Sequence, residues 1–134
     1  MNKNFVRMFQ PRFAALVDAG VKKQTVRPVP KRLPEPGDLL DAREWIGRPY
    51  RSKQRKIGRF RITRVCPIFI DAYGVSLGYG NGRWIAVDPT KFARADGFEG
   101  FEELWSSFWE FYHEERFHGI VIFWDPQSRK EDNA

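Results

Sequence analysis

The sequence is poor in cysteine and in long hydrophobic runs. Cys66 is the single cysteine among the 134 residues, so no disulfide can form within the chain. A lone cysteine in an apolar run is typical of a buried thiol, and the lack of disulfides fits a reducing compartment. No stretch approaches the ~20 apolar residues of a membrane span, and residues 1–10 lack the apolar run of a signal peptide. We therefore expect a cytoplasmic protein with no membrane partner.

Motifs for metals and cofactors are also missing. The two histidines, His113 and His118, belong to no HExxH or Cys/His cluster, and we expect them to face solvent near a helix end. The glycine-rich segment at residues 73–82 lacks the lysine of a phosphate-binding loop. The sequence also shows no order of Ser, His and Asp residues that would indicate a catalytic triad. The sequence thus predicts neither a metal site nor a cofactor.

Positive charge is concentrated in the middle of the chain. Residues 22–64 carry 14 Lys and Arg against four acids, a net of +10, whereas the rest carries −4, which together give the overall +6. Such asymmetry indicates a polyanionic partner, most often a nucleic acid. The alternative is a solvated basic surface without a ligand.

Aromatic residues are abundant, with 12 Phe and five Trp. We expect Trp105, Trp109 and Trp124 in the core because of helical spacing and strand burial. Tyr73, Tyr79 and Trp84 flank the glycine-rich segment, and Trp45 is either a cleft wall or a core residue. Some of these rings are candidates for stacking on bases.

The pattern predicts an α+β chain in which short strands dominate the middle. That order favours a small β-barrel decorated by helices, with a two-layer α+β sheet as the alternative. The length fits one domain, residues 1–126, followed by a polar C-terminal tail at residues 127–134. Strands are expected at residues 5–8, 25–27, 39–45, 56–70, 84–87 and 119–124, and helices at residues 11–20, 89–97 and 101–115.

One segment carries the most informative chemistry. A helix ending at Gly20 leads into an extended stretch that bears Lys22, Thr25 and Arg27. Residues two apart on a strand share a face, so Thr25 and Arg27 should point the same way, and Lys22 could reach the same cleft. A lysine, a hydroxyl and a guanidinium together suit an anionic or polar ligand. On the pattern alone, these cations could equally be solvated.

Several motifs in order resemble the ASCH domain family. They are Gly20-x-Lys22-x-x-Thr25-x-Arg27, the turn Pro36-Gly37-Asp38, a central strand at residues 56–65, a short helix at residues 92–98 and a closing strand at residues 119–124. Residues 43–53 resemble the branch found in phages and prophages. The resemblance implies the ASCH fold, a PUA-like β-barrel whose cleft faces RNA or nucleosides.

One branch of that family removes the acetyl group of N4-acetylcytidine with a lysine base, a threonine nucleophile and a glutamate acid. Carried over by motif, these roles fall on Lys22, Thr25 and Asp96, the last being one methylene shorter than the family's Glu. Glu99 is a nearby substitute. A threonine needs such a base before it can attack. The alternative without catalysis is that Lys22 and Arg27 bind phosphate, while Thr25 caps or hydrogen-bonds the backbone.

We therefore expect a protein that binds RNA or a modified nucleoside in a basic cleft. The alternatives are an amidohydrolase, a ribonuclease on single-stranded RNA, and a module that binds another protein through its aromatic surface. The oligomeric state is not predicted. Arg43, Arg55 and Lys56 are further candidates for a phosphate-contacting stripe; the expected ligand-binding residues are Arg27, Trp45, Tyr50, Arg51, Lys53, Arg59 and Arg61.

Overall fold

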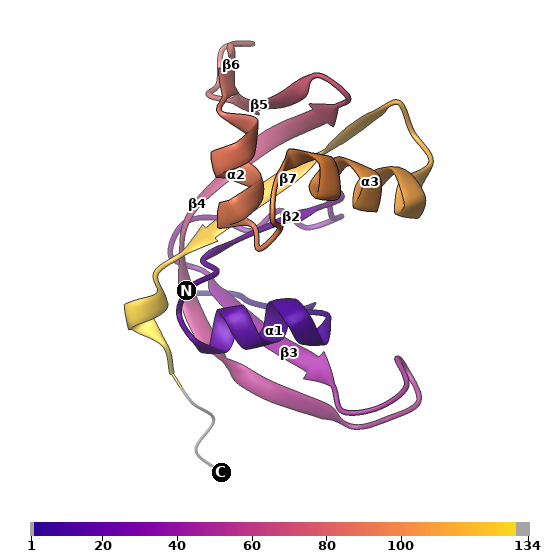
Figure 1. Ribbon diagram of the computed structural model, residues 1–134. Helices are drawn as coiled ribbons and strands as arrows, with labels where there is room; N and C mark the ends of the chain where they lie inside the picture. Colours follow the sequence, from indigo (N-terminus) through magenta and orange to yellow (C-terminus); the bar gives the residue numbers. More distant parts are fainter. Residues whose placement is uncertain (1, 131–134) are drawn as a thin grey trace. The chain divides into compact units, whose positions relative to one another are not determined.

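The computed structural model describes residues 2–130, and these form an α+β fold (Figure 1). The sheet runs in the order β1-β3-β4-β5-β6, and β7 pairs with both β2 and β4. The elements in chain order are β1 (Asn4–Met8), α1 (Pro11–Asp18), β2 (Gln24–Arg27), β3 (Leu39–Trp45), β4 (Gln54–Asp71), β5 (Gly74–Gly78), β6 (Trp84–Val87), α2 (Pro89–Ala95), α3 (Phe101–Tyr112), β7 (Arg116–Trp124) and the 3-10 turn η1 (Pro126–Ser128).

The chain divides into two compact units. Within the described residues, unit 1 comprises residues 2–23, 34–64 and 123–130, and unit 2 comprises residues 24–33 and 65–122. The long strand β4 begins in unit 1 and ends in unit 2, and β7 runs from unit 2 into unit 1.

Unit 1 is built on three strands and one helix. β1 pairs in parallel with β3, and β3 pairs antiparallel with β4. The register of β3 and β4 slips at Ala42/Arg43, where Gly58 has φ +156°, a bulge that a side chain would strain. Helix α1 starts with Pro11, packs on β3 and ends before Gly20, whose φ is +77°. The apolar interior includes Val17, Leu40, Phe60, Ile62 and Trp124.

Unit 2 combines a hairpin with two helices. β5 pairs antiparallel with β4 and with β6. The Asp88 carboxylate caps α2 by accepting from the backbone N–H groups of Thr90 and Lys91, at 3.0 and 3.1 Å. Helix α2 packs against α3 and β5 (Figure 1). The interior contains Ile68, Ile70, Val75, Leu104, Val121 and Ile122.

The expected closed β-barrel does not form in the part of the chain described. There, β1 pairs only with β3, and β6 pairs only with β5, so the two ends of the strand order are not joined. A barrel needs those end strands to pair. The coarser α+β assignment is confirmed.

Two expectations for α3 were wrong. The helix ends at Tyr112 rather than at residue 115, because His113 adopts a left-handed φ of +54°. Trp109, expected in the core, is 45% exposed, and Phe111 is 73% exposed. Apolar spacing identifies a helix face, but it does not show how far neighbouring elements cover that face.

The expected tail at residues 127–134 is ordered where the structure describes it. Asp125 caps η1, and Arg129 donates to the Asp18 carboxylate and to the backbone carbonyls of Val17 and Asp18. The guanidinium thereby satisfies the carbonyl end of α1. Residues 131–134 of the predicted tail lie outside the described residues. Across residues 2–130, no helix has the length and apolar character required to cross a membrane.

Candidate functional site

The chain passes from unit 1 to unit 2 inside the motif of residues 20–27. After α1, the backbone N–H groups of Val21 and Lys22 both donate to the carbonyl of Leu16, at 2.9 and 3.0 Å. This turn lies at the end of the first segment of unit 1, and β2 begins unit 2 at Gln24. The motif is polar but buried: Lys22, Gln24 and Thr25 are 3%, 6% and 4% exposed.

Lys22 is the buried cation of the motif in unit 1. Its ammonium lies 5.2 Å from the centre of the Phe13 ring on α1, a cation–π contact. Lysine is among the residues least often buried, because removing its charge from water is costly. The contact with the Phe13 ring offsets part of the cost of burying this charge.

Thr25 and Arg27 lie together on β2 in unit 2. Arg27 donates from Nε to Thr25 Oγ1 across 3.0 Å, as their two-residue spacing predicts. Because the threonine oxygen accepts this bond, its own O–H remains available to donate. A guanidinium at that distance also favours negative charge on the oxygen. The pair is therefore suited to hold a polar ligand or to activate the hydroxyl.

Asp96 closes helix α2, and it contacts a residue that sequence reasoning missed. Its side chain, in a residue 5% exposed, accepts from Gln24 Nε2 at 3.4 Å. Within the described chain, Thr25 and Asp96 share no hydrogen bond. Successive side chains of a strand point to opposite faces, which separates the Gln24 contact from the Thr25 contact. The only sequence signal for Gln24 was its position inside the motif.

An aromatic residue lies near the Arg27 charge. Burial raises the pKa of the Tyr112 phenol above its ordinary value, and the positive charge of Arg27 acts in the opposite direction. The Tyr112 ring also packs on Phe108 and Phe117, with centres 5.7 and 4.8 Å apart. One side of the Arg27 environment is therefore a cluster of rings.

The hairpin between β3 and β4 carries four of the expected ligand-binding residues. Trp45 at the end of β3 packs on Tyr50, with ring centres 5.2 Å apart, and Tyr50 is 87% exposed at a φ of +64°. Arg51 and Lys53 are exposed beside it, and among the described residues their side chains form no hydrogen bond or ion pair. The tip therefore offers an aromatic pair and two uncommitted cations.

Other cations of the expected stripe are engaged with acids. Arg61 Nη2 lies 3.1 Å from Asp125, and Arg43 Nη2 lies 2.8 Å from Asp41. Arg55 pairs with Glu44 at 2.6 Å. These ion pairs neutralise part of the positive charge that a count of residues assigns to the surface.

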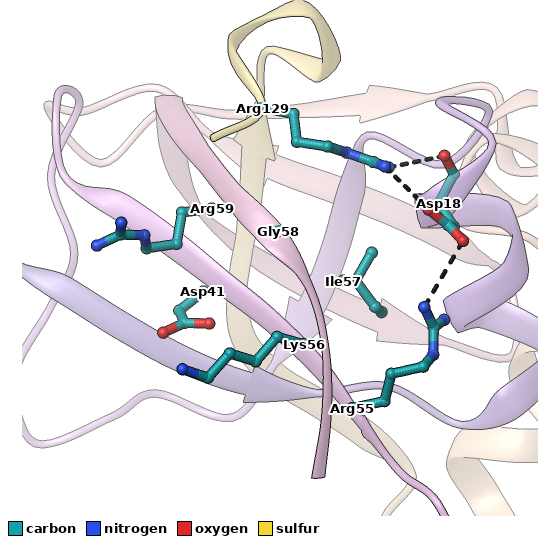
Figure 2. Close-up of a pocket in the computed structure, with 8 residues that line it drawn as sticks. All are labelled: Asp18, Asp41, Arg55, Lys56, Ile57, Gly58, Arg59 and Arg129. Atoms are coloured by element: carbon teal, nitrogen blue, oxygen red, sulfur yellow. Dashed lines mark hydrogen bonds and ion pairs between the residues drawn. The ribbon is translucent and has the colours of Figure 1, made fainter. Parts of the chain in front are cut away.

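A cavity of about 320 Å³ lies in unit 1 (Figure 2). Arg55 and Arg129 converge on Asp18, at 3.8 and 2.9 Å, on one side of the view. Arg59, which we expected to bind ligand, lines the cavity. The full lining is Asp18, Asp41, Arg55, Lys56, Ile57, Gly58, Arg59 and Arg129.

Asp41 is a structural anion at this cavity. Burial by itself raises the pKa of its carboxyl group, but hydrogen bonds from Arg43 and Asn4 and the charges of Arg43 and Lys56 outweigh burial. The net effect lowers the pKa of Asp41 below its ordinary value. Asp18, Asp41 and Arg129 were not anticipated as neighbours, because their sequence separations carry no local signal.

The histidines are exposed, as expected. His113 follows α3, and His118 lies on β7 with its ring 5.9 Å from that of Phe69. No group of three or more His, Cys, Asp or Glu side chains suited to a metal ion occurs among residues 2–130.

Comparisons of this chain with protein-family models, with curated proteins and with solved structures gave no match.

Proposed function

We propose that the protein is an ASCH-type protein with a PUA-like fold that binds RNA or a modified nucleoside. The observation that carries the proposal is the pair on β2 in which Arg27 donates from Nε to Oγ1 of the buried Thr25 across 3.0 Å. The threonine O–H stays available to donate, and the guanidinium supplies positive charge beside it. A donor and a cation on one face of a strand suit a polar or anionic ligand.

The exposed hairpin supports the RNA side of the proposal. Single-stranded nucleic acid is bound by aromatic rings that stack on bases and by cations that contact phosphates. The Trp45–Tyr50 pair with Arg51 and Lys53 provides both kinds of group on one loop. Cations already paired with acids, such as Arg61, should contribute less.

A second candidate function, hydrolysis of an N4-acylated cytidine, is favoured by the Arg27–Thr25 hydrogen bond. In this reaction a base takes the hydroxyl proton while Thr25 Oγ1 attacks the acyl carbonyl, and the family motif assigns the base role to Lys22. The C–N bond breaks as an acid protonates the departing amine, the role that the family motif assigns to Asp96, and water then releases the acyl group from the threonine. Gln24 holds the Asp96 carboxyl group at 3.4 Å and is its positioning residue.

The experiment combines a turnover assay with a binding assay. N4-acetylcytidine is incubated with the protein, and released cytidine is measured by chromatography for the parent, Lys22→Ala, Thr25→Ala and Thr25→Ser. Thr63→Ala, at an exposed position of β4, is the matched control. A labelled single-stranded RNA is titrated in parallel at about 50 and about 200 mM salt.

The outcomes separate the functions. Salt-sensitive RNA binding or saturable nucleoside binding, without turnover, supports the binding function. Cytidine release that is lost in Lys22→Ala and Thr25→Ala but kept in Thr63→Ala supports the hydrolase. Cleavage of the RNA would instead indicate a ribonuclease. Failure of both ligands to bind at the lower salt contradicts the whole proposal.

A further inference from the structure

A second cavity, remote in sequence from the motif, lies within unit 2. Its volume is about 720 Å³, within the range of small-molecule sites, and it is open to solvent. None of Gln24, Thr25, Arg27 or Asp96 lines it. The lining residues are Asp71, Ala72, Tyr73, Trp105, Trp109, Glu115 and Arg116.

Aromatic rings form much of this cavity. Trp105 and Trp109 lie one turn apart on α3, with ring centres 6.3 Å apart, and Trp109 is 45% exposed. Tyr73, in the turn between β4 and β5, is 95% exposed, and within the described chain its ring packs on no other ring. Large rings left open to water at a concave site are suited to stacking on a planar ligand.

The charged residues of the cavity are not equivalent. Asp71 is already used: Oδ1 accepts from the backbone N–H groups of Tyr73 and Gly74, at 2.9 and 3.2 Å, and Oδ2 lies 3.5 Å from Arg116. Glu115 is exposed, and among residues 2–130 its carboxylate has no hydrogen bond or ion pair. The cavity therefore presents one uncommitted carboxylate beside its rings.

An uncommitted carboxylate discriminates among the planar bases. A carboxylate only accepts hydrogen bonds, and its two oxygens match two adjacent donors. Guanine presents N1–H and the N2 amino group side by side on its Watson–Crick edge. Adenine, cytosine and uracil each place an acceptor next to their single donor group on that edge, so a carboxylate is repelled at one of its oxygens.

We propose that this cavity binds a guanine nucleotide, with the base stacked on Trp109 and Tyr73 and its Watson–Crick edge facing Glu115. Arg116 supplies the cation for the phosphate; its guanidinium lies 4.5 Å from the centre of the Phe69 ring, and its ion pair with Asp71 is long, at 3.5 Å, so the phosphate can share the charge. The inference rests on the proposed function, because it names a base that the RNA-binding protein recognises outside the motif.

The test is calorimetric titration of the full chain with GMP, AMP, CMP, UMP and inosine monophosphate, which lacks the N2 amino group. GMP should bind about tenfold or more tightly than AMP, CMP or UMP, and inosine monophosphate should fall between. Trp109→Ala should weaken GMP binding about tenfold, since stacking on one ring is removed. Glu115→Gln should remove the preference for GMP while keeping most of the stacking.

Neighbouring residues provide matched controls. Phe111→Ala removes an exposed ring of α3 that does not line the cavity, and Glu114→Gln removes the adjacent carboxylate. Both variants should bind GMP within about twofold of the parent, which is the scatter expected for a surface substitution. Equal binding of all the nucleotides, no GMP binding at millimolar concentration, or insensitivity to both Trp109→Ala and Glu115→Gln would overturn the inference.

The nucleoside and RNA assays of the proposed function are run on the same preparation. If N4-acetylcytidine or RNA binds while GMP does not, the guanine site alone is rejected. If GMP binds as expected while the motif ligands do not, the motif assignment fails and the guanine site stands as an independent nucleotide site.

Discussion

The Nε–H of Arg27 points at Thr25 Oγ1, 3.0 Å away, from the next position on the same face of β2. The threonine oxygen is thus an acceptor from a cation, and its hydroxyl proton is left for a ligand or a base. A buried hydroxyl needs a hydrogen-bond partner, and here that partner is a guanidinium rather than a backbone group. This relationship links the motif to the chemistry proposed for it.

Replacing the guanidinium should weaken that chemistry without unfolding the chain. Arg27→Lys keeps the charge but loses the Nε donor and the planar fork. We expect affinity for N4-acetylcytidine, or its turnover, to fall about tenfold, the equivalent of one charge-assisted hydrogen bond. Titration calorimetry and the cytidine-release assay measure the effect. Lys31→Ala, at an exposed loop position of the same unit, is the control, and an equal loss there would argue against a specific role.

Asp41 should make the stability of the protein pH-dependent. Its pKa is lowered in the folded state, so its contribution is present above the unfolded value of about 3.9 and is lost as the pH falls toward the folded value. Asp41→Asn should reduce the free energy of unfolding by about 1–3 kcal/mol at neutral pH and by less in acid. Urea unfolding at neutral and acidic pH tests this. Thr63→Ala, at an exposed position of β4, should show no such difference.

Gly119 should tolerate no side chain. A Cβ atom at this position of β7 would lie 2.4 Å from the Arg27 carbonyl oxygen on the neighbouring strand β2. Gly119→Ala must therefore shift β2, and we expect a loss of about 2 kcal/mol or more in unfolding free energy together with weaker ligand binding. Gly100→Ala is the control, because its Cβ would meet nothing within 4 Å. Equal stability of the two variants in thermal unfolding would show that β2 and β7 are not so tightly packed.

The uncommitted cations of the hairpin should dominate RNA binding. Arg51→Ala and Lys53→Ala should each reduce the slope of log affinity against log salt by about 0.7, the value expected for one phosphate contact on a single strand. Arg61→Ala should change the slope less, because Asp125 already pairs with that side chain at 3.1 Å. Fluorescence anisotropy at several salt concentrations measures the three slopes. A larger change of slope for Arg61→Ala than for the other two variants would contradict the proposal that ion pairing makes a cation less available to RNA.

Local signals in the sequence located most of the elements. The bounds of β3 and β6 were predicted to the residue, because the Gly37-Asp38 turn and the Asp88-Pro89 cap delimit them. The end of α3 was missed because His113, rather than a glycine, takes the left-handed conformation there. Strand closure depends on pairings between distant segments, and no local pattern reports them.

The candidate site, too, was predictable only where the signal was local in the sequence. The two-residue spacing was enough to place Thr25 beside Arg27. The Gln24–Asp96 contact joins residues 72 positions apart, and the Asp18–Arg129 pair joins residues 111 positions apart, so neither has a sequence signature. The net charge of residues 22–64 did not show which cations are available to a ligand. A count of charges cannot distinguish a cation paired with an acid, such as Arg61, from an uncommitted one, such as Lys53.

The most direct measurement of the central claim is an NMR titration that follows the backbone amides and the Arg27 Nε–H resonance while N4-acetylcytidine or a short single-stranded RNA is added. We expect saturable shifts of Arg27 Nε–H and of the amides of Gln24, Thr25 and Arg27, because a ligand there must alter the hydrogen bond to Thr25 Oγ1. Unchanged resonances of this segment at saturating concentrations of both ligands would contradict it.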